Sequence, residues 1–135
     1  MQKGGDKKYD LEERTAKFGE NIVEFARKIP KNEVTKRIIS QLVGAGTAVG
    51  SNYCEADCAE SNKDFIHKMC VANKEAKETK YFLRISSKAE PALSEEARVL
   101  GKEAHELNLI FTTIIKKAKT TEAKKKLLKK NSKFT

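Results

Sequence analysis

Four potential zinc ligands lie near one another in the middle of the chain. Cys54 and Cys58 are four residues apart, and His67 and Cys70 are three residues apart. If these segments form an antiparallel hairpin, the two pairs approach each other, and structural zinc sites use such side chains. The spacing matches no common zinc motif, and a lone cysteine is an ordinary small buried residue. We therefore predict that the protein holds no metal and no other cofactor.

The glycine-rich segment Gly44–Gly50 has the composition of a phosphate-binding loop but not its pattern. It lacks a Gly-Lys-Ser/Thr ending and no strand pattern precedes it. Gly46 and Gly50 instead fit the close approach of two helices. A di-iron centre requires paired Glu-x-x-His motifs, whereas the chain offers a single Asp64-x-x-His67. With two histidines and no nucleophile on a loop, we predict that the protein is not an enzyme.

A block of lysines near the C-terminal end carries most of the net charge. Residues 116–135 contain nine lysines and one acid, which gives +8 of the chain's net charge of +9. Such blocks often contact nucleic acid or other acidic partners. The alternative is a solvated helix end that only aids solubility. The candidate nucleic-acid-binding residues are Lys116, Lys117, Lys119, Lys124, Lys125, Lys126, Lys129, Lys130 and Lys133.

Apolar residues recur at three- and four-residue spacing along most of the chain, which predicts four amphipathic helices. Asp10, Asn62 and Ser94 are suitable N-cap residues for three of them. The helices are expected at about residues 11–29, 32–59, 63–87 and 95–118. Their links are short, which favours antiparallel neighbours. The predicted fold is all-α, an antiparallel up-down-up-down four-helix bundle.

The chain divides into three parts on this interpretation. Residues 1–9 form a flexible N-terminus, residues 10–118 form the bundle, and residues 119–135 form a lysine-rich C-terminal tail. In the tail, Leu127 and Leu128 leave room for a short amphipathic continuation and little more.

The predicted second helix carries two apolar bands. The main band includes Asn52, a polar residue that would fix the register of the helices if it is buried. The second band lies about 60–140° further round the helix and suggests contact with another subunit. The alternative is a central helix of a monomer. The second band consists of Ile39, Val43, Gly46, Gly50 and Tyr53. Glu55 and Glu75 flank the apolar bands, where they are placed to accept hydrogen bonds or ion pairs from across the bundle.

Several features bear on the cellular compartment. No run of about 18 apolar residues is present, so we expect neither a transmembrane helix nor a membrane partner. The first residues lack the apolar segment of a signal peptide. Three cysteines, an odd number, argue against a disulfide framework. These features favour the cytoplasm.

The order of residues in the middle of the chain resembles that of a known family. The segments concerned are residues 49–56, 64–68, 74–76 and 78–83. They are similar to the 23S rRNA intervening-sequence proteins, which are bacterial four-helix-bundle proteins, and the likeness spans about residues 11–117. The resemblance implies a small cytoplasmic protein that assembles into a ring-like homopentamer. It also implies that Asn52, Glu55 and Glu75 are packing positions.

The resemblance extends to function. Related accessory proteins of diversity-generating retroelements are basic pentamers that bind a reverse transcriptase and nucleic acid. We therefore expect a non-enzymatic oligomeric scaffold that binds RNA or DNA through a basic surface and the lysine tail. The alternative is a protein-interaction module, an accessory subunit for a polymerase, reverse transcriptase or other protein, in which the tail is incidental. Cys54 stands where many members carry a basic residue, which weakens the case for RNA contact on that face.

Overall fold

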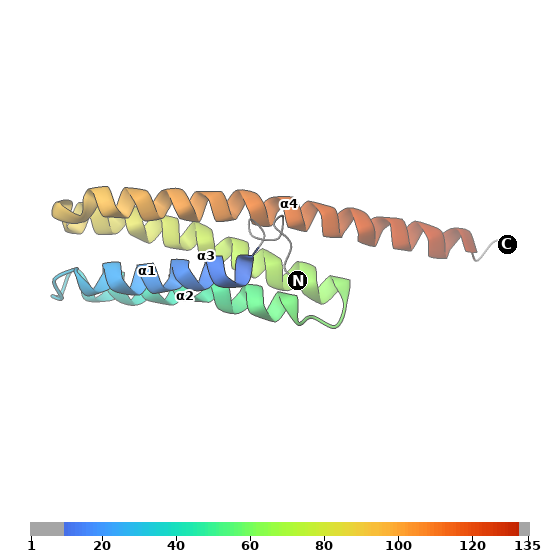
Figure 1. Cartoon of the computed structure of the whole chain (residues 1–135), viewed down its shortest axis with the longest axis horizontal. Coiled ribbons are helices and arrows are strands. Elements are labelled where there is room, and N and C mark those ends of the chain that lie inside the picture. Colours follow the sequence, from blue (N-terminus) through green and yellow to red (C-terminus); the bar gives the residue numbers. More distant parts are fainter. Residues whose placement is uncertain (1–9, 133–135) are drawn as a thin grey trace.

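The computed structural model describes residues 10–132, which form helices joined by short links and contain no strand (Figure 1). The elements are α1 (Leu11–Arg27), α2 (Lys36–Asp57), α3 (Asn62–Ala89), a short 3₁₀ helix η2 (Pro91–Leu93) and α4 (Ser94–Ser132). Consecutive long helices run antiparallel, so the predicted all-α up-down-up-down bundle is confirmed. The predicted flexible segment 1–9 lies outside the described residues. No helix within residues 10–132 combines the length and the apolar character needed to cross a membrane.

Side-chain caps set where α1 and α3 begin. As predicted, the Asp10 carboxylate accepts a hydrogen bond from the backbone N–H of Glu13 at 3.2 Å. The prediction that Asn62 caps α3 was wrong, because Ser61 Oγ accepts from the backbone N–H of Asp64 at 3.1 Å. The prediction for Ser94 also fails, because this residue is already helical and its hydroxyl donates to the Ser87 carbonyl oxygen.

The α2 helix begins at Lys36, four residues after the predicted start at Asn32. The Asn32 side-chain oxygen accepts from the backbone N–H groups of Val34 and Thr35 at 2.9 and 3.0 Å. The Thr35 hydroxyl in turn donates to the carbonyl oxygen of Pro30. Short polar side chains offer the backbone such an alternative to the helical ladder. The turn after Pro30 therefore delays α2.

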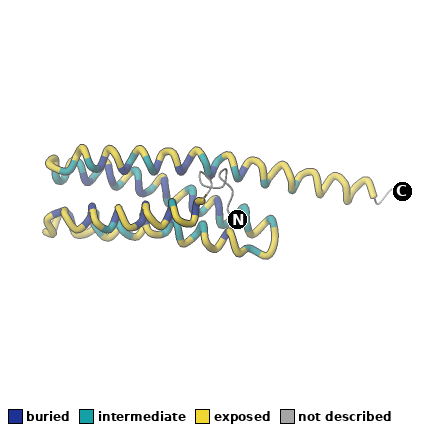
Figure 2. The backbone as a smooth tube through the Cα atoms, viewed as in Figure 1, coloured by how far each residue is buried: buried dark blue, intermediate teal, exposed yellow. Residues whose placement is uncertain are grey.

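The core runs along the centre of the bundle (Figure 2). The α1 helix packs on α2, α2 packs on α3, and α3 packs on α4, whereas α1 and α4 contact each other only sparsely. Phe18, Phe25 and Phe111 are the largest fully buried side chains. Tyr53 of α2 stacks on Phe111 of α4 with ring centroids 6.4 Å apart. The core therefore also joins α2 to α4, which are not consecutive helices. The buried apolar side chains of the four long helices form one continuous cluster.

The second apolar band of α2 is used inside the chain. A Cβ atom at Gly46 would lie 2.7 Å from Ile22 Cγ2 of α1, and one at Gly50 would lie 3.1 Å from Thr15 Oγ1. Ile39, Val43 and Tyr53 pack against the core cluster of the same chain. The small residues therefore let α1 and α2 approach closely. The band gives no separate argument for a contact with another subunit.

Replacing Gly46 with alanine is expected to destabilise the bundle by about 1–3 kcal/mol, because the new methyl group overlaps Ile22 in a packed core. Gly44 is the matched control, since a Cβ there meets nothing within 4 Å. Gly44→Ala should stabilise the helix by about 0.5–1 kcal/mol. Urea denaturation measures both effects. Equal changes in the two variants would show that α1 and α2 are not closely packed at Gly46.

The α4 helix continues without a break through the predicted boundary between residues 118 and 119, and it ends at Ser132. Figure 1 shows this end of α4 projecting past the other three helices. The prediction of only a short continuation around Leu127 and Leu128 was therefore wrong. The Thr120 and Thr121 hydroxyls donate to the carbonyl oxygens of Lys116 and Lys117, so these residues stay within the helix. We call residues 119–132 the α4 extension.

Candidate nucleic-acid interface

The base of the α4 extension is attached to the start of α3. The Asn62 amide nitrogen donates to the carbonyl oxygen of Ala118 and to Glu122 Oε1, both at 3.0 Å. Beyond this point, every residue from Ala123 to Ser132 is exposed (Figure 2). The extension thus leaves the bundle at Glu122 as a helix surrounded by solvent.

Eight of the nine predicted nucleic-acid-binding lysines lie on α4, and all eight are exposed. Lys116 and Lys117 belong to the last turns that still touch the bundle, and the other six belong to the extension. The ninth, Lys133, lies outside the described residues. The structure thus places these eight cations on one continuous helix.

A concave site of about 550 Å³ lies where the extension leaves α3. Lys63 from the first turn of α3 lines it together with Lys125, Lys126 and Lys129 of the extension. Glu122 is the acid on its wall, and the hydrogen bond from Asn62 is the main cause that lowers the pKa of this carboxyl group. The positive charges of Lys125, Lys63 and Lys126 lower this pKa further. The site therefore combines four lysines with one carboxylate, Glu122, which already accepts a hydrogen bond from Asn62.

Sequence reasoning missed a second set of cations on α3. Its members are exposed and fall within a sector of about 80° when residues advance by 100° along the helix. No acid of α3 falls in this sector. The members of this α3 basic band are Lys63, Lys74, Lys77, Arg84 and Lys88. Their spacing, mostly in steps that return to the same helical face, was the signal that could have revealed them.

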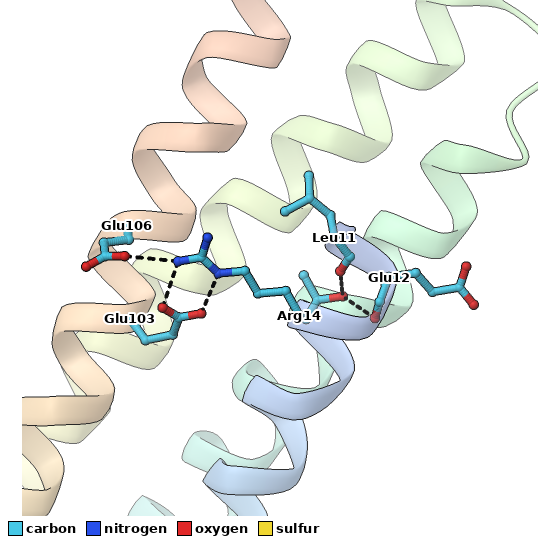
Figure 3. A network of polar contacts seen from close by, with 6 residues as sticks. Leu11, Glu12, Arg14, Glu103 and Glu106 are labelled. Carbon is cyan, nitrogen blue, oxygen red and sulfur yellow. Dashed lines mark hydrogen bonds and ion pairs between the residues drawn. The ribbon is translucent and has the colours of Figure 1, made fainter. Parts of the chain in front are cut away.

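Three acids of α4, by contrast, pair with cations of α1. Arg14 of α1 donates to both carboxylate oxygens of Glu103 at 2.7 and 2.8 Å and to Glu106 at 3.0 Å (Figure 3). Hydrogen bonding to Glu103 is the main cause that raises the pKa of the Arg14 guanidinium. At the far end of α1, Lys28 pairs with Glu96 at 2.8 Å. These pairs offset two of the three negative charges on the α1 side of α4 and join two helices that otherwise contact each other sparsely.

Replacing Arg14 with glutamine should destabilise the bundle by about 1 kcal/mol, because it leaves two adjacent carboxylates without their cation at a half-buried position. Arg98→Gln is the control: Arg98 pairs with Glu95 within α4, and 64% of its side chain is exposed. Its loss should change stability by less than about 0.5 kcal/mol. Thermal unfolding at low salt distinguishes the two. An equal effect of both substitutions would contradict a bridging role for Arg14.

The predicted packing residues differ in their roles. Asn52 is only half-buried, and its amide donates to the Ala48 carbonyl oxygen of its own helix at 2.8 Å. This bond lies within one helix and does not fix the register of two helices, so the packing role of Asn52 stays a prediction. Glu55 accepts from Lys68 Nζ at 2.6 Å and so joins α2 to α3. Glu75 lies beside Glu78 of the same helix, and burial followed by the Glu78 charge raises its pKa.

The buried amide that links two helices is Asn108 of α4, which is 5% exposed. Its nitrogen donates to the side-chain oxygen and the backbone carbonyl oxygen of Asn73 at 2.6 and 2.9 Å. Asn73 donates in turn to Thr112 at 3.3 Å. The sequence did not single out these residues. The only signal was that Asn108 directly follows Leu107, which belongs to the apolar band of α4. They fix α3 against α4 midway along the bundle.

The potential zinc ligands do not form a site in the part of the chain that the structure describes. Cys54, Cys58 and Cys70 are free and exposed, and residues 10–132 contain no cluster of three or more His, Cys, Asp or Glu side chains placed to hold a metal ion. Desolvation, followed by the nearby Glu12 charge, raises the pKa of the Cys54 thiol. A raised pKa disfavours the thiolate that acts as a nucleophile.

The fold and its charged end define a four-helix-bundle protein with a basic helical extension. The family model for the 23S rRNA-intervening sequence protein matches residues 7–113. The chain belongs to this family, and the resemblance noted in its sequence is thereby confirmed. The lysines from Lys116 onward lie beyond the matched segment.

A solved structure agrees with this assignment. It is the crystal structure of a protein of unknown function from the S23 ribosomal protein family of Bacteroides thetaiotaomicron. The two chains share 29% identity and superpose with a TM-score of 0.72, over 78% of this chain and 98% of the other. The comparison with curated proteins gave no match.

Proposed function

We propose that this protein is a non-enzymatic, oligomeric helical scaffold that binds RNA or DNA through phosphate contacts. The observation that carries the proposal is the α4 extension, which holds six lysines and one acid on an exposed helix. A protein that neutralises phosphates with lysines releases condensed counterions, and this release drives binding. Lys63 of the α3 basic band adds a further cation at the base of the extension, where it lines a concave site with Lys125 and Lys126.

The charge pattern of the extension supports a polyanionic partner. Lys125 and Lys129, and likewise Lys126 and Lys130, are four residues apart and so adjacent on the helix. Like charges at this spacing destabilise a helix by about 0.2–0.5 kcal/mol per pair. A row of phosphates relieves this repulsion, whereas a neutral partner does not. Lysine contacts to phosphates position the protein and carry no sequence information, so we expect sequence-independent binding.

The proposal is tested by measuring affinity for duplex DNA and structured RNA across a salt series. Neutralising five lysines of the extension, Lys124, Lys125, Lys126, Lys129 and Lys130, to glutamine should weaken binding at least tenfold. On duplex DNA, the slope of log affinity against log salt should also fall by up to about 0.9 for each phosphate that the variant no longer neutralises.

Arginine at the same five positions is the matched control, because it keeps the charge and should keep the affinity. Truncation after Ala118 should act like the glutamine variant. If the full chain binds neither nucleic acid at physiological salt, the proposal is wrong and a protein partner takes its place. If it binds but the glutamine variant binds equally well, the extension is not the interface.

We further propose that copies of the chain associate into a homo-oligomer, a pentamer as the family resemblance implies. Val99 and Leu109 of α4 are 54% and 57% exposed, and contacts between copies through α4 would bury them. Several extensions on one assembly raise the effective concentration of lysines near a bound polyanion. Light scattering coupled to size exclusion should give five times the 15.2 kDa chain mass. A mass of one chain at micromolar concentration would overturn this part of the proposal.

A further inference from the structure

We propose that the α4 extension inserts into the major groove of B-form duplex DNA. This inference rests on the proposed function and names the kind of nucleic acid that the extension recognises. Three properties of the extension support the inference. They are the distribution of lysines round the helix, the width of the helix relative to the groove, and the cluster of lysines at its base.

The lysines surround the extension instead of lining one face. At 100° per residue, its six lysines leave no lysine-free sector wider than about 120°. Lys124, Lys125 and Lys126 alone point in three directions about 100° apart. A flat anionic surface reaches the cations of one face only. A groove with phosphates along both walls reaches cations on both sides of the inserted helix.

The dimensions agree with this arrangement. An α-helix with its side chains is about 10–12 Å wide, and the major groove of B-DNA is about 12 Å wide. The ten exposed residues from Ala123 to Ser132 span about 15 Å, which corresponds to about four base pairs. The major groove of duplex RNA is too deep and narrow for side chains to read, so it does not accept such a helix. The extension therefore discriminates between the two duplexes by shape.

The base of the extension forms the boundary of the proposed DNA interface. The hydrogen bonds of Asn62 to Ala118 and Glu122 fix where the free helix begins. The concave site of about 550 Å³ beside them exposes Lys63, Lys125, Lys126 and Lys129. The start of α3 stops the helix from entering further, and these lysines meet the phosphates at the rim of the groove. The insertion depth is thus set by the bundle.

The experiment compares the full chain on three probes of one sequence at about 150 mM salt: a 20-base-pair DNA duplex, the same duplex in RNA, and single-stranded DNA. We expect at least tenfold tighter binding to the DNA duplex than to the RNA duplex. Dimethyl sulfate methylates guanine N7, which lies in the major groove, so bound protein should protect these atoms.

Two variants that leave the charge unchanged test whether binding requires the extension to be helical. Ala123→Pro interrupts the extension just beyond Glu122 and changes no charge, whereas Ala123→Ser leaves the helix in place. The proline variant should lose the N7 protection and at least tenfold in affinity for the DNA duplex, while its binding to single-stranded DNA persists. The serine variant should behave like the natural chain. Circular dichroism confirms that the bundle of both variants is folded.

The outcomes separate this inference from the proposed function. Equal affinity for the DNA and RNA duplexes, unprotected N7 atoms or an unaffected proline variant would each overturn groove insertion and leave phosphate binding standing. If the chain binds none of the three probes, both the inference and the proposed function are wrong.

Discussion

The attachment of α4 to α3 is the constraint on which the rest of the structure depends. Asn108 holds Asn73 at mid-bundle, and Asn62 holds Ala118 and Glu122 at the end. The buried Asn108 side-chain oxygen accepts no hydrogen bond from residues 10–132, and an unpaired buried oxygen costs about 1–3 kcal/mol that an apolar side chain would avoid. An apolar pair, however, packs in more than one register, whereas these amide contacts form in one. The direction in which α4 leaves the bundle follows from that register.

The same register determines which charged residues of α4 face α1 and which face solvent. Its acids Glu96, Glu103 and Glu106 pair with Lys28 and Arg14 of α1, so the weakly packed side of the bundle is held by ion pairs. Its lysines are left for solvent. The α3 basic band contains no acid in its sector, and the Glu55–Lys68 pair lies on the side toward α2. Internal ion pairing on one side of the molecule therefore leaves uncompensated positive charge on the other side and on the extension.

The helices and their order could be predicted because apolar spacing reflects burial directly. Polar contacts could not, because they depend on which side chains meet across helices. Asn52 lies on the apolar band of α2 yet turns back to its own helix, while Asn108 finds Asn73 on α3. Asn62 looked like a cap and instead reaches residues 56 and 60 positions away. The lysines were evident in the sequence, but their placement on a projecting helix follows from the unbroken α4 helix.

Glu122 marks the boundary between the part of α4 that is stabilised by packing and the part that is not. On one side of it, Phe111 and Ile115 are buried against the bundle. On the other side, the residues to Ser132 are exposed, and the lysines among them repel one another. Its carboxylate, kept ionised by Asn62 and the adjoining lysines, stabilises Lys125 and Lys126 at favourable helical spacing. Because four lysines share the concave site with this one carboxylate, the site stays cationic toward phosphates. Folding stability and anion binding are thus assigned to successive segments of one helix, and the single acid of the extension separates them.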